Sequence, residues 1–330
     1  MINKRRSLTI LGSLFTLTVL FGGSVLGAEL FFYKPYPGKL QYNLSIKTHA
    51  LLDTGLPGRF GKIVRDHEDI MSLIQRVKET DTGLLDIATT IEKINFLPHG
   101  PTHGATYKRE EIEGNTQHVK INLLGKVEEA HVLPHIGSWS FWQEEGEDGP
   151  PLDFYNIMLM LNPRFPLELL EIGDSWESED EMELGLAEAL PVAGLMELHY
   201  ELELTVRQKI QYTLLDWVEK KGYRCIRIGF EAKFRTDGVL YDAHTGTYVA
   251  GTGESSGEYY FAPAEGLLVS ASITHKANEK RSIDGSIKTF LTRDEPMFLY
   301  SYDRPSIPIP WRSERTVSLE LVEPQAISKR

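Results

Sequence analysis

Cysteine is nearly absent from this chain, because only Cys225 among its 330 residues carries a thiol. An intramolecular disulfide is therefore impossible, and stability has to come from a buried apolar core. Cys225 lacks a flanking redox or haem-attachment motif, so we expect a small and inert thiol. The sequence also has no glycine-rich phosphate loop followed by lysine, and we predict no cofactor.

Basic residues are in the minority, with 35 Lys and Arg against 47 Asp and Glu, a formal net charge of −12. Nucleic acids and anionic membrane surfaces select patches of Lys and Arg, so this balance argues against both as partners. The acidic runs at residues 144–148 and 177–181 do not follow the twelve-residue calcium-loop pattern. We interpret both runs as solvated loops.

Long apolar runs are absent with one exception, residues 7–28, which follow a basic cluster at residues 4–6. A basic start, an apolar middle and small residues near the end form an export signal. The run is also long enough to span a bilayer, which needs roughly 20 residues. Cleavage near Ala28 and retention as an anchor are both open, and either places the body outside the cytoplasm, in the periplasm or secreted. Without a cysteine at Ala28 or Glu29, we expect no lipid attachment there.

Period-two alternation of apolar and polar residues dominates the remaining chain and predicts strands with one buried face. The clearest case is residues 40–46, and the longest is residues 198–214, for which we predict a bulge near Gln208. A turn at residues 220–222 should pair the long strand with residues 226–234 in an antiparallel hairpin.

Further strands are expected where similar alternation is bounded by turn residues. A turn at residues 263–266 should join an aromatic strand to the next one, and a turn at residues 81–83 should join residues 71–77 to 85–91. The spacing in residues 70–77 also fits a helix. Shorter or later strands are expected at residues 119–123, 287–291 and 317–321, the last after an extended proline-rich connector, residues 305–310.

The predicted fold is therefore mainly β, with long antiparallel strands in curved sheets or a half-barrel and one or two short helices. We divide the chain into residues 1–28 (signal or anchor), 29–150 (N-terminal β-rich half), 151–164 (helix and connector) and 165–330 (C-terminal β-rich half). The best helix candidate, residues 152–161, is apolar nearly all round, which is typical of a core helix or of a lid over an apolar cavity. As a lid, it would turn Phe154, Met158 and Leu161 towards a bound ligand.

Motifs for catalysis are weak. Residues 253–257 match the G-x-S-x-G nucleophile elbow in letters, but that elbow needs a strand before the serine and a helix after it. His275 and Asp284 follow in the order opposite to that of the elbow fold. We interpret the match as a glycine-rich turn and predict no catalytic residue.

Two histidine pairs, His99 with His103 and His131 with His135, have the spacing of a helical zinc motif. Each pair encloses a proline, which removes the helix that would bring both imidazoles together. We predict no metal site.

A resemblance becomes visible in residues 165–176, which are led by proline and end in Gly-Asp-Ser-Trp, followed by residues 222–228 and by the aromatic strand and glycine turn of residues 257–266. This combination resembles a broad group of uncharacterised exported bacterial β-rich proteins. By extension the chain is similar to the half-barrel of periplasmic lipoprotein carriers. The resemblance implies an antiparallel sheet wrapped around an apolar concavity, with helices against it.

Together these features favour a non-catalytic protein of the cell envelope that binds or carries an apolar ligand, such as an acyl chain. One alternative is an envelope scaffold that binds other proteins through strand edges or through Tyr259 and Tyr260. A second is a metal-dependent hydrolase, which requires His99 and His103 to meet an acidic residue in space.

Overall fold

The described part of the chain is all β. The computed structural model describes residues 28–53, 62–99, 113–131, 161–192, 196–242, 245–284, 286–291, 296–301 and 307–322. No helix occurs within these ranges, and hence none that could span a bilayer. The prediction of a mainly β fold with long antiparallel strands is confirmed. Of the predicted helix at residues 152–161, only Leu161 lies among the described residues.

Most of the strands are long. The strands are β1 (Tyr36–Asp53), β2 (Lys62–Glu79), β3 (Leu85–Pro98), β4 (Thr116–Ile121), β5 (Val127–His131), β6 (Ser175–Val192), β7 (Met196–Lys220), β8 (Tyr223–Asp242), β9 (Thr245–Ala262), β10 (Leu267–Asp284), β11 (Ser286–Leu291), β12 (Pro296–Ser301) and β13 (Ile307–Leu321). A strand of 18 residues, such as β1, is about 60 Å long at roughly 3.3 Å per residue.

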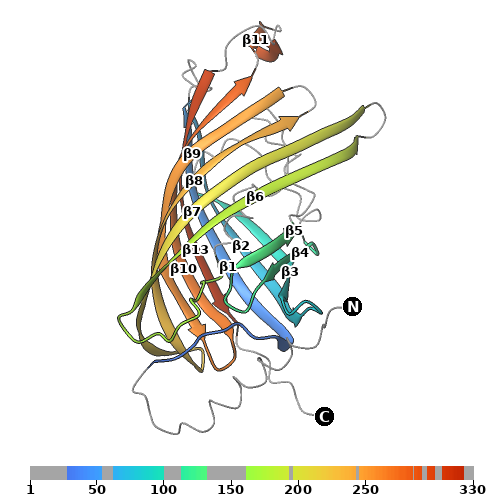
Figure 1. Cartoon of the computed structure of the whole chain (residues 1–330). Helices are drawn as coiled ribbons and strands as arrows, with labels where there is room; N and C mark the ends of the chain where they lie inside the picture. Colours follow the sequence, from blue (N-terminus) through green and yellow to red (C-terminus); the bar gives the residue numbers. More distant parts are fainter. Residues whose placement is uncertain are drawn as a thin grey trace, which may run out of the picture.

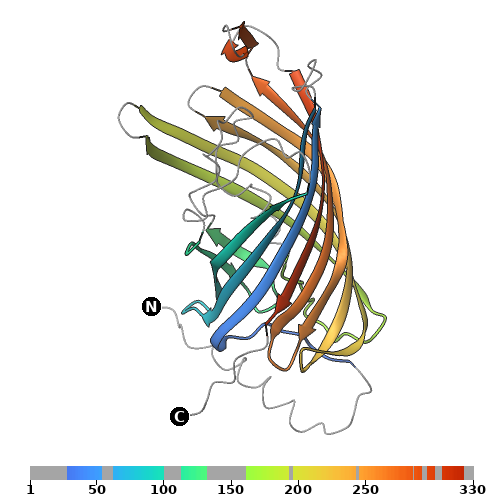
Figure 2. The same cartoon turned by 180° about the vertical axis from the view of Figure 1, so that it is seen from behind.

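Eleven strands form one antiparallel sheet in the order β5-β4-β3-β2-β1-β13-β10-β9-β8-β7-β6, and β11 pairs only with β12. The last long strand, β13, lies between β1 and β10, so it joins the strands from the two ends of the chain into a single sheet. The sheet is strongly curved and its end strands, β5 and β6, do not pair with each other (Figures 1 and 2). The architecture is an open half-barrel.

The two faces of the sheet differ because side chains alternate along each strand. In β1 the even-numbered residues Leu40, Tyr42, Leu44 and Ile46 are buried. The odd-numbered residues between them are polar and face the other side. The register continues this division across the sheet, since Leu44 pairs with Met71 of β2 and with Leu319 of β13. A slip of one residue would turn every apolar side chain to the wrong face.

The apolar face is the concave one, as the N-terminal segment shows. Residues 28–35 run across the end of the sheet at which β1 begins (Figure 1). The backbone N of Tyr33 donates to the carbonyl of Leu123 at 2.8 Å, and that of Lys34 donates to Gly266 at 3.1 Å. These acceptors lie in the β4–β5 and β9–β10 turns, which are far apart in the strand order. A short segment that bonds to both has to cross the inside of the curve.

A second segment, residues 161–174, ties the two edges of the sheet together at the same end. The backbone N of Phe165 donates to Leu124 beside β5 at 2.8 Å, and the segment leads directly into β6 at the opposite edge. Glu29 and Leu170 form an isolated antiparallel bridge between the two segments. We call this closed end the base and residues 161–174 the strap.

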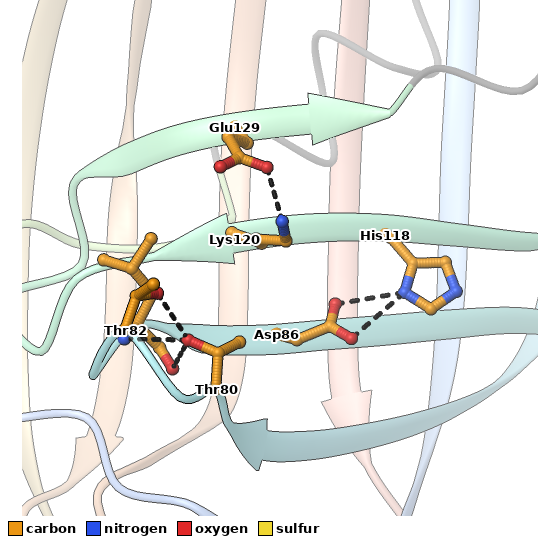
Figure 3. A network of polar contacts seen from close by, with 7 residues as sticks. Thr80, Thr82, Asp86, His118, Lys120 and Glu129 are labelled. Carbon is orange, nitrogen blue, oxygen red and sulfur yellow. Dashed lines mark hydrogen bonds and ion pairs between the residues drawn. The ribbon is translucent and has the colours of Figure 1, made fainter.

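The outer face is densely charged. Directly paired positions on six neighbouring strands carry Glu179, Lys209, Lys233, Glu254, Lys276 and Glu314. Lys209 Nζ lies 2.7 Å from Glu177 Oε2, and Arg207 Nη2 lies 2.7 Å from Glu181 Oε1. Near the β5 edge, Lys120 pairs with Glu129, and His118 Nδ1 lies 3.0 Å from Asp86 Oδ1 (Figure 3). This face is a solvated surface.

Several expected elements are confirmed. The β7–β8 hairpin turns at Lys221 and Gly222, which both have positive φ, and the β9–β10 turn includes Gly266 with φ of 70°. Residues 70–77 belong to strand β2, so their helical spacing was misleading. Residues 287–291 form a strand, although it lies outside the main sheet.

Three local predictions were wrong. Residues 253–257 are not a turn, because they lie in the middle of β9 with partners on both sides. Gln208 pairs regularly with Phe234, and the register shift lies instead between Leu214 and Asp216. The acidic residues 177–181 are not a loop, because they belong to β6, where pairing with the basic residues of β7 offsets the charge. The other acidic run, residues 144–148, lies outside the described residues.

Candidate functional site on the inner face

The inner face begins at the base with a cluster of aromatic rings, which we call the floor. Its members come from both base segments and from four strands: Phe31, Tyr33, Phe165, Trp176, Tyr212, Phe230, Tyr259 and Phe261. Phe165 lies at the centre, with ring centroids 4.8 Å from Phe261 and 5.6 Å from Phe31. Such contacts add to the hydrophobic gain of burying the rings.

The polar atoms of the floor have defined partners. Tyr33 Oη donates to the carbonyl of Pro163 at 3.1 Å, and Trp176 Nε1 donates to that of Arg164 at 2.6 Å. Burial raises the pKa of Tyr212 to about 12 and holds that of Tyr33 well above its ordinary value. The floor is therefore a packed core whose polar atoms have hydrogen-bond partners, and its tyrosines stay neutral at any physiological pH.

A buried ion pair lies beside the floor, between Arg164 of the strap and Asp180 of β6. Both side chains are about 6 % exposed, and burial lowers the pKa of Arg164. A buried charge that loses its partner is costly, so this pair fixes where the strap meets the edge strand.

Above the floor, a row of polar side chains crosses five adjacent strands at directly paired positions. This polar row consists of His67 (β2), Thr48 (β1), Arg315 (β13), His275 (β10) and Ser255 (β9). All five are less than 9 % exposed. Asp69, one step closer to the base, places Oδ2 3.4 Å from His67 Nε2. Polar groups this deeply buried are hydrogen-bonded in folded proteins, and the row brings hydroxyl, imidazole and guanidinium groups together on one surface.

Within the polar row, Ser255 and His275 form a buried contact, with Oγ 2.9 Å from Nδ1. The imidazole also stacks on Phe234 of β8 at a centroid distance of 4.6 Å and an interplanar angle of 8°. Phe234 reaches His275 by crossing β9 at Gly253, where an added Cβ would lie 2.0 Å from the ring. Gly257 similarly makes room beneath Phe230, with an added Cβ 3.0 Å from its ring.

This geometry explains the G-x-S-x-G letters without a nucleophile. The two glycines give space to aromatic rings from the neighbouring strand, and the serine between them lies in a straight strand instead of a strand-to-helix turn. Asp284 is nine residues further along β10 than His275, about 30 Å away in an extended strand. It is therefore too far away to orient the imidazole as a third catalytic residue.

One step above the polar row, four adjacent strands carry small side chains. This small row consists of Ala50 (β1), Ser313 (β13), Ala277 (β10) and Gly253 (β9) at directly paired positions. Ser313 is 5 % exposed, and its Oγ has no hydrogen-bond partner among the described residues. A buried hydroxyl without a partner among the described residues invites a polar group of a ligand.

Of the three residues predicted to bind a ligand, the structure describes Leu161. Leu161 lies at the start of the strap, 4 % exposed and within the core that contains the floor. Phe154 and Met158 lie outside the described residues. The polar and small rows were missed because they exist only through strand register. Each strand contributes one residue to each row that crosses it, so no single segment of the sequence contains the whole row.

The other candidates from the sequence are placed as follows. His99 is exposed beside Glu68, with Nε2 3.4 Å from Oε2, whereas His103 and His135 lie outside the described residues. No group of metal-binding side chains occurs in the described ranges. Tyr259 belongs to the floor and is buried, so it cannot serve as the exposed contact of a scaffold. Cys225 is fully buried, and burial raises the pKa of its thiol to about 11.

Comparisons with known proteins are sparse. No protein-family model matches the chain, and no curated protein matches it. Similar solved structures include OccK9 (OpdG) of Pseudomonas aeruginosa, 8 % identical over 86 % of this chain and 98 % of that one, with a TM-score of 0.24. OmpF of Salmonella typhi in complex with daunomycin is 6 % identical over 85 % and 97 % of the two chains, with a TM-score of 0.23. Likenesses of this size carry no argument about the function of the chain.

Proposed function

We propose that the chain is an extracytoplasmic binding or carrier protein for an amphiphilic ligand, and that it catalyses no reaction. The observation that supports this most is the asymmetry of the curved sheet. Its outer face carries rows of charged residues, while its inner face carries the floor, the polar row and the small row. An amphiphile matches such a face, because its apolar part replaces water against aliphatic and aromatic side chains.

The order of the rows suggests how the ligand would lie. The polar head would meet the polar row and Ser313, where hydroxyl, imidazole and guanidinium groups can donate hydrogen bonds. The apolar part would extend over the small row, where Ala50 and Ala277 carry only a methyl group. The resemblance to half-barrel carriers implies the same side of the sheet for the ligand.

The outer face favours a location in water. Strands that contact lipid carry an apolar outer band, whereas the outer row that crosses β6 to β10 consists of Glu179, Lys209, Lys233, Glu254 and Lys276. Together with the export signal predicted for residues 7–28, this favours a sheet that is exposed to the periplasm or the exterior.

Titration of the purified full chain with a pyrene-labelled fatty acid tests the proposal. We expect saturable binding. Ala277→Phe fills the small row and should weaken binding by roughly tenfold, about 1.4 kcal/mol. Asn278→Phe adds the same ring on the outer face and should leave the affinity unchanged.

A second inner-face variant, Ala50→Phe, guards against misfolding of the first, and circular dichroism should show the native spectrum for each variant used. Absence of saturable binding, or equal affinities for the inner-face and outer-face variants, would contradict the proposal.

A further inference from the structure

The base carries most of the exposed apolar surface of the described chain. In the described chain, seven large apolar side chains are exposed to solvent. Five of them lie at the base: Leu30, Leu123, Leu167, Leu169 and Ile172. Leu167 is 76 % exposed and Leu169 58 %. The strap is the reason for this concentration. Its Phe165 and Leu170 turn into the core, which leaves the intervening leucines pointing outwards.

These side chains gather from three segments that are bonded together. The bridge between Glu29 and Leu170 is antiparallel, so Leu30 lies opposite Leu169. Leu123 is held next to the same segments by the bond from Tyr33 N to its carbonyl. Gathered apolar side chains on the surface of a water-soluble domain mark a site of interaction.

The segment that precedes Leu30 in the sequence indicates what the exposed apolar residues of the base contact. The described chain starts at Ala28, which is the last residue of the apolar run of residues 7–28. Only one residue separates that run from Leu30. If the run is retained in the bilayer, the surface of the bilayer lies next to this patch and not next to the opposite end of the strands.

We infer that the base is a membrane-docking surface, in which Leu30, Leu167, Leu169 and Ile172 enter the interfacial layer of the bilayer. Leucines of this kind anchor proteins at an interface by burying apolar area among headgroups and acyl chains. Glu168 and Glu171 alternate with them in the strap and are exposed. Their charges favour a zwitterionic surface over an anionic one. The inference is independent of the ligand on the inner face.

The test uses the full chain in phosphatidylcholine vesicles and one environment-sensitive fluorophore per molecule. The label is attached through Leu167→Cys or Ile172→Cys. The native Cys225 should not compete, because it is buried and its thiol pKa is raised to about 11. Leu97→Cys is the matched control, since Leu97 is 41 % exposed but lies on β3, away from the base.

We expect labels at positions 167 and 172 to emit at shorter wavelength and to be quenched by brominated phosphatidylcholine, whereas the label at position 97 is not quenched. Emission like that of position 97 from both base labels would overturn the inference. Short-wavelength emission that brominated lipid does not quench would also overturn it, by showing that protein covers the patch. Either result leaves the fatty-acid titration unaffected, so a failure here is distinguishable from a failure of the proposed function.

Discussion

At the scale of single residues, glycines decide how the central strands pack. Gly253 and Gly257 lie opposite Phe234 and Phe230, and the two rings occupy the space that side chains would need. Phe234 then reaches His275, which in turn contacts Ser255. The residues that match the catalytic elbow motif therefore serve the packing of neighbouring strands. The sequence alone could not show this, because the rings that need the glycines belong to another strand.

Gly257→Ala should destabilise the fold by about 2 kcal/mol, because overpacking a well-packed core typically costs about 1–3 kcal/mol. An added Cβ would lie 2.0 Å from the backbone carbonyl of Ser272, which cannot move without breaking the β9–β10 pairing. Gly229→Ala is the control, since its Cβ would meet only the side chain of Leu215, at 3.3 Å. We expect the control to remain within about 1 kcal/mol of the wild type. Denaturant unfolding measures both, and equal effects would contradict the packing account.

The buried tyrosines predict how stability depends on pH. Burial raises the pKa of Tyr212 from 10.0 to about 12, so the folded chain keeps a proton that the unfolded chain loses above pH 10. Stability is therefore full below pH 10 and falls as pH rises towards 12, by about 1.4 kcal/mol per pH unit for each such group. Tyr212→Phe should make the decline less steep. An unchanged slope in denaturant unfolding between pH 10 and 12 would show that Tyr212 is not responsible.

At the scale of elements, the strap closes the base and links the two edges of the sheet. Phe165 sits between Phe31, Tyr33, Trp176 and Phe261, with centroid distances of 4.8–6.4 Å. The Arg164–Asp180 pair joins the same segment to β6. Among the described residues, the other links between the β5 and β6 sides are the path across the sheet and residues 28–35, which bond to the β4–β5 and β9–β10 turns.

Phe165→Ala should cost about 3–5 kcal/mol, because it removes a large ring from the centre of the floor. Leu167→Ala, two residues away, should change stability by no more than about 0.5 kcal/mol, since that side chain is largely exposed. Thermal or denaturant unfolding of the two variants tests the contrast. Similar losses for both would mean that the strap packs differently from the structure described.

The elements themselves could be predicted from the sequence to a large extent. Alternation identified β1, β7, β8, β10 and the end of β13, and the turn residues at 220–222 and 263–266 fixed two hairpins. What alternation cannot show is which distant strands pair. The position of β13 between β1 and β10 depends on β1–β13 pairs such as Tyr42 with Leu321, which are 279 residues apart, and only this pairing brings Arg315 next to Thr48 and His275. The candidate site is therefore a product of topology.

At the scale of the whole molecule, one sheet separates two environments. The outer face carries alternating charges, and the inner face changes from an aromatic floor to polar and small rows along the strands. The base closes one end and presents leucines to the outside. This change of surface character along the strands is consistent with both proposals: that the inner face binds an amphiphile and that the base contacts a membrane.

Mass spectrometry of solvent extracts from the full chain, purified from cell envelopes without added lipid, tests the central claim most directly. We predict about one amphiphilic molecule per chain in the wild type and in Asn278→Phe, and strong depletion in Ala277→Phe. Equal amounts in Ala277→Phe and the wild type, or no co-purified amphiphile in a wild-type chain of native stability, would contradict a ligand site on the inner face.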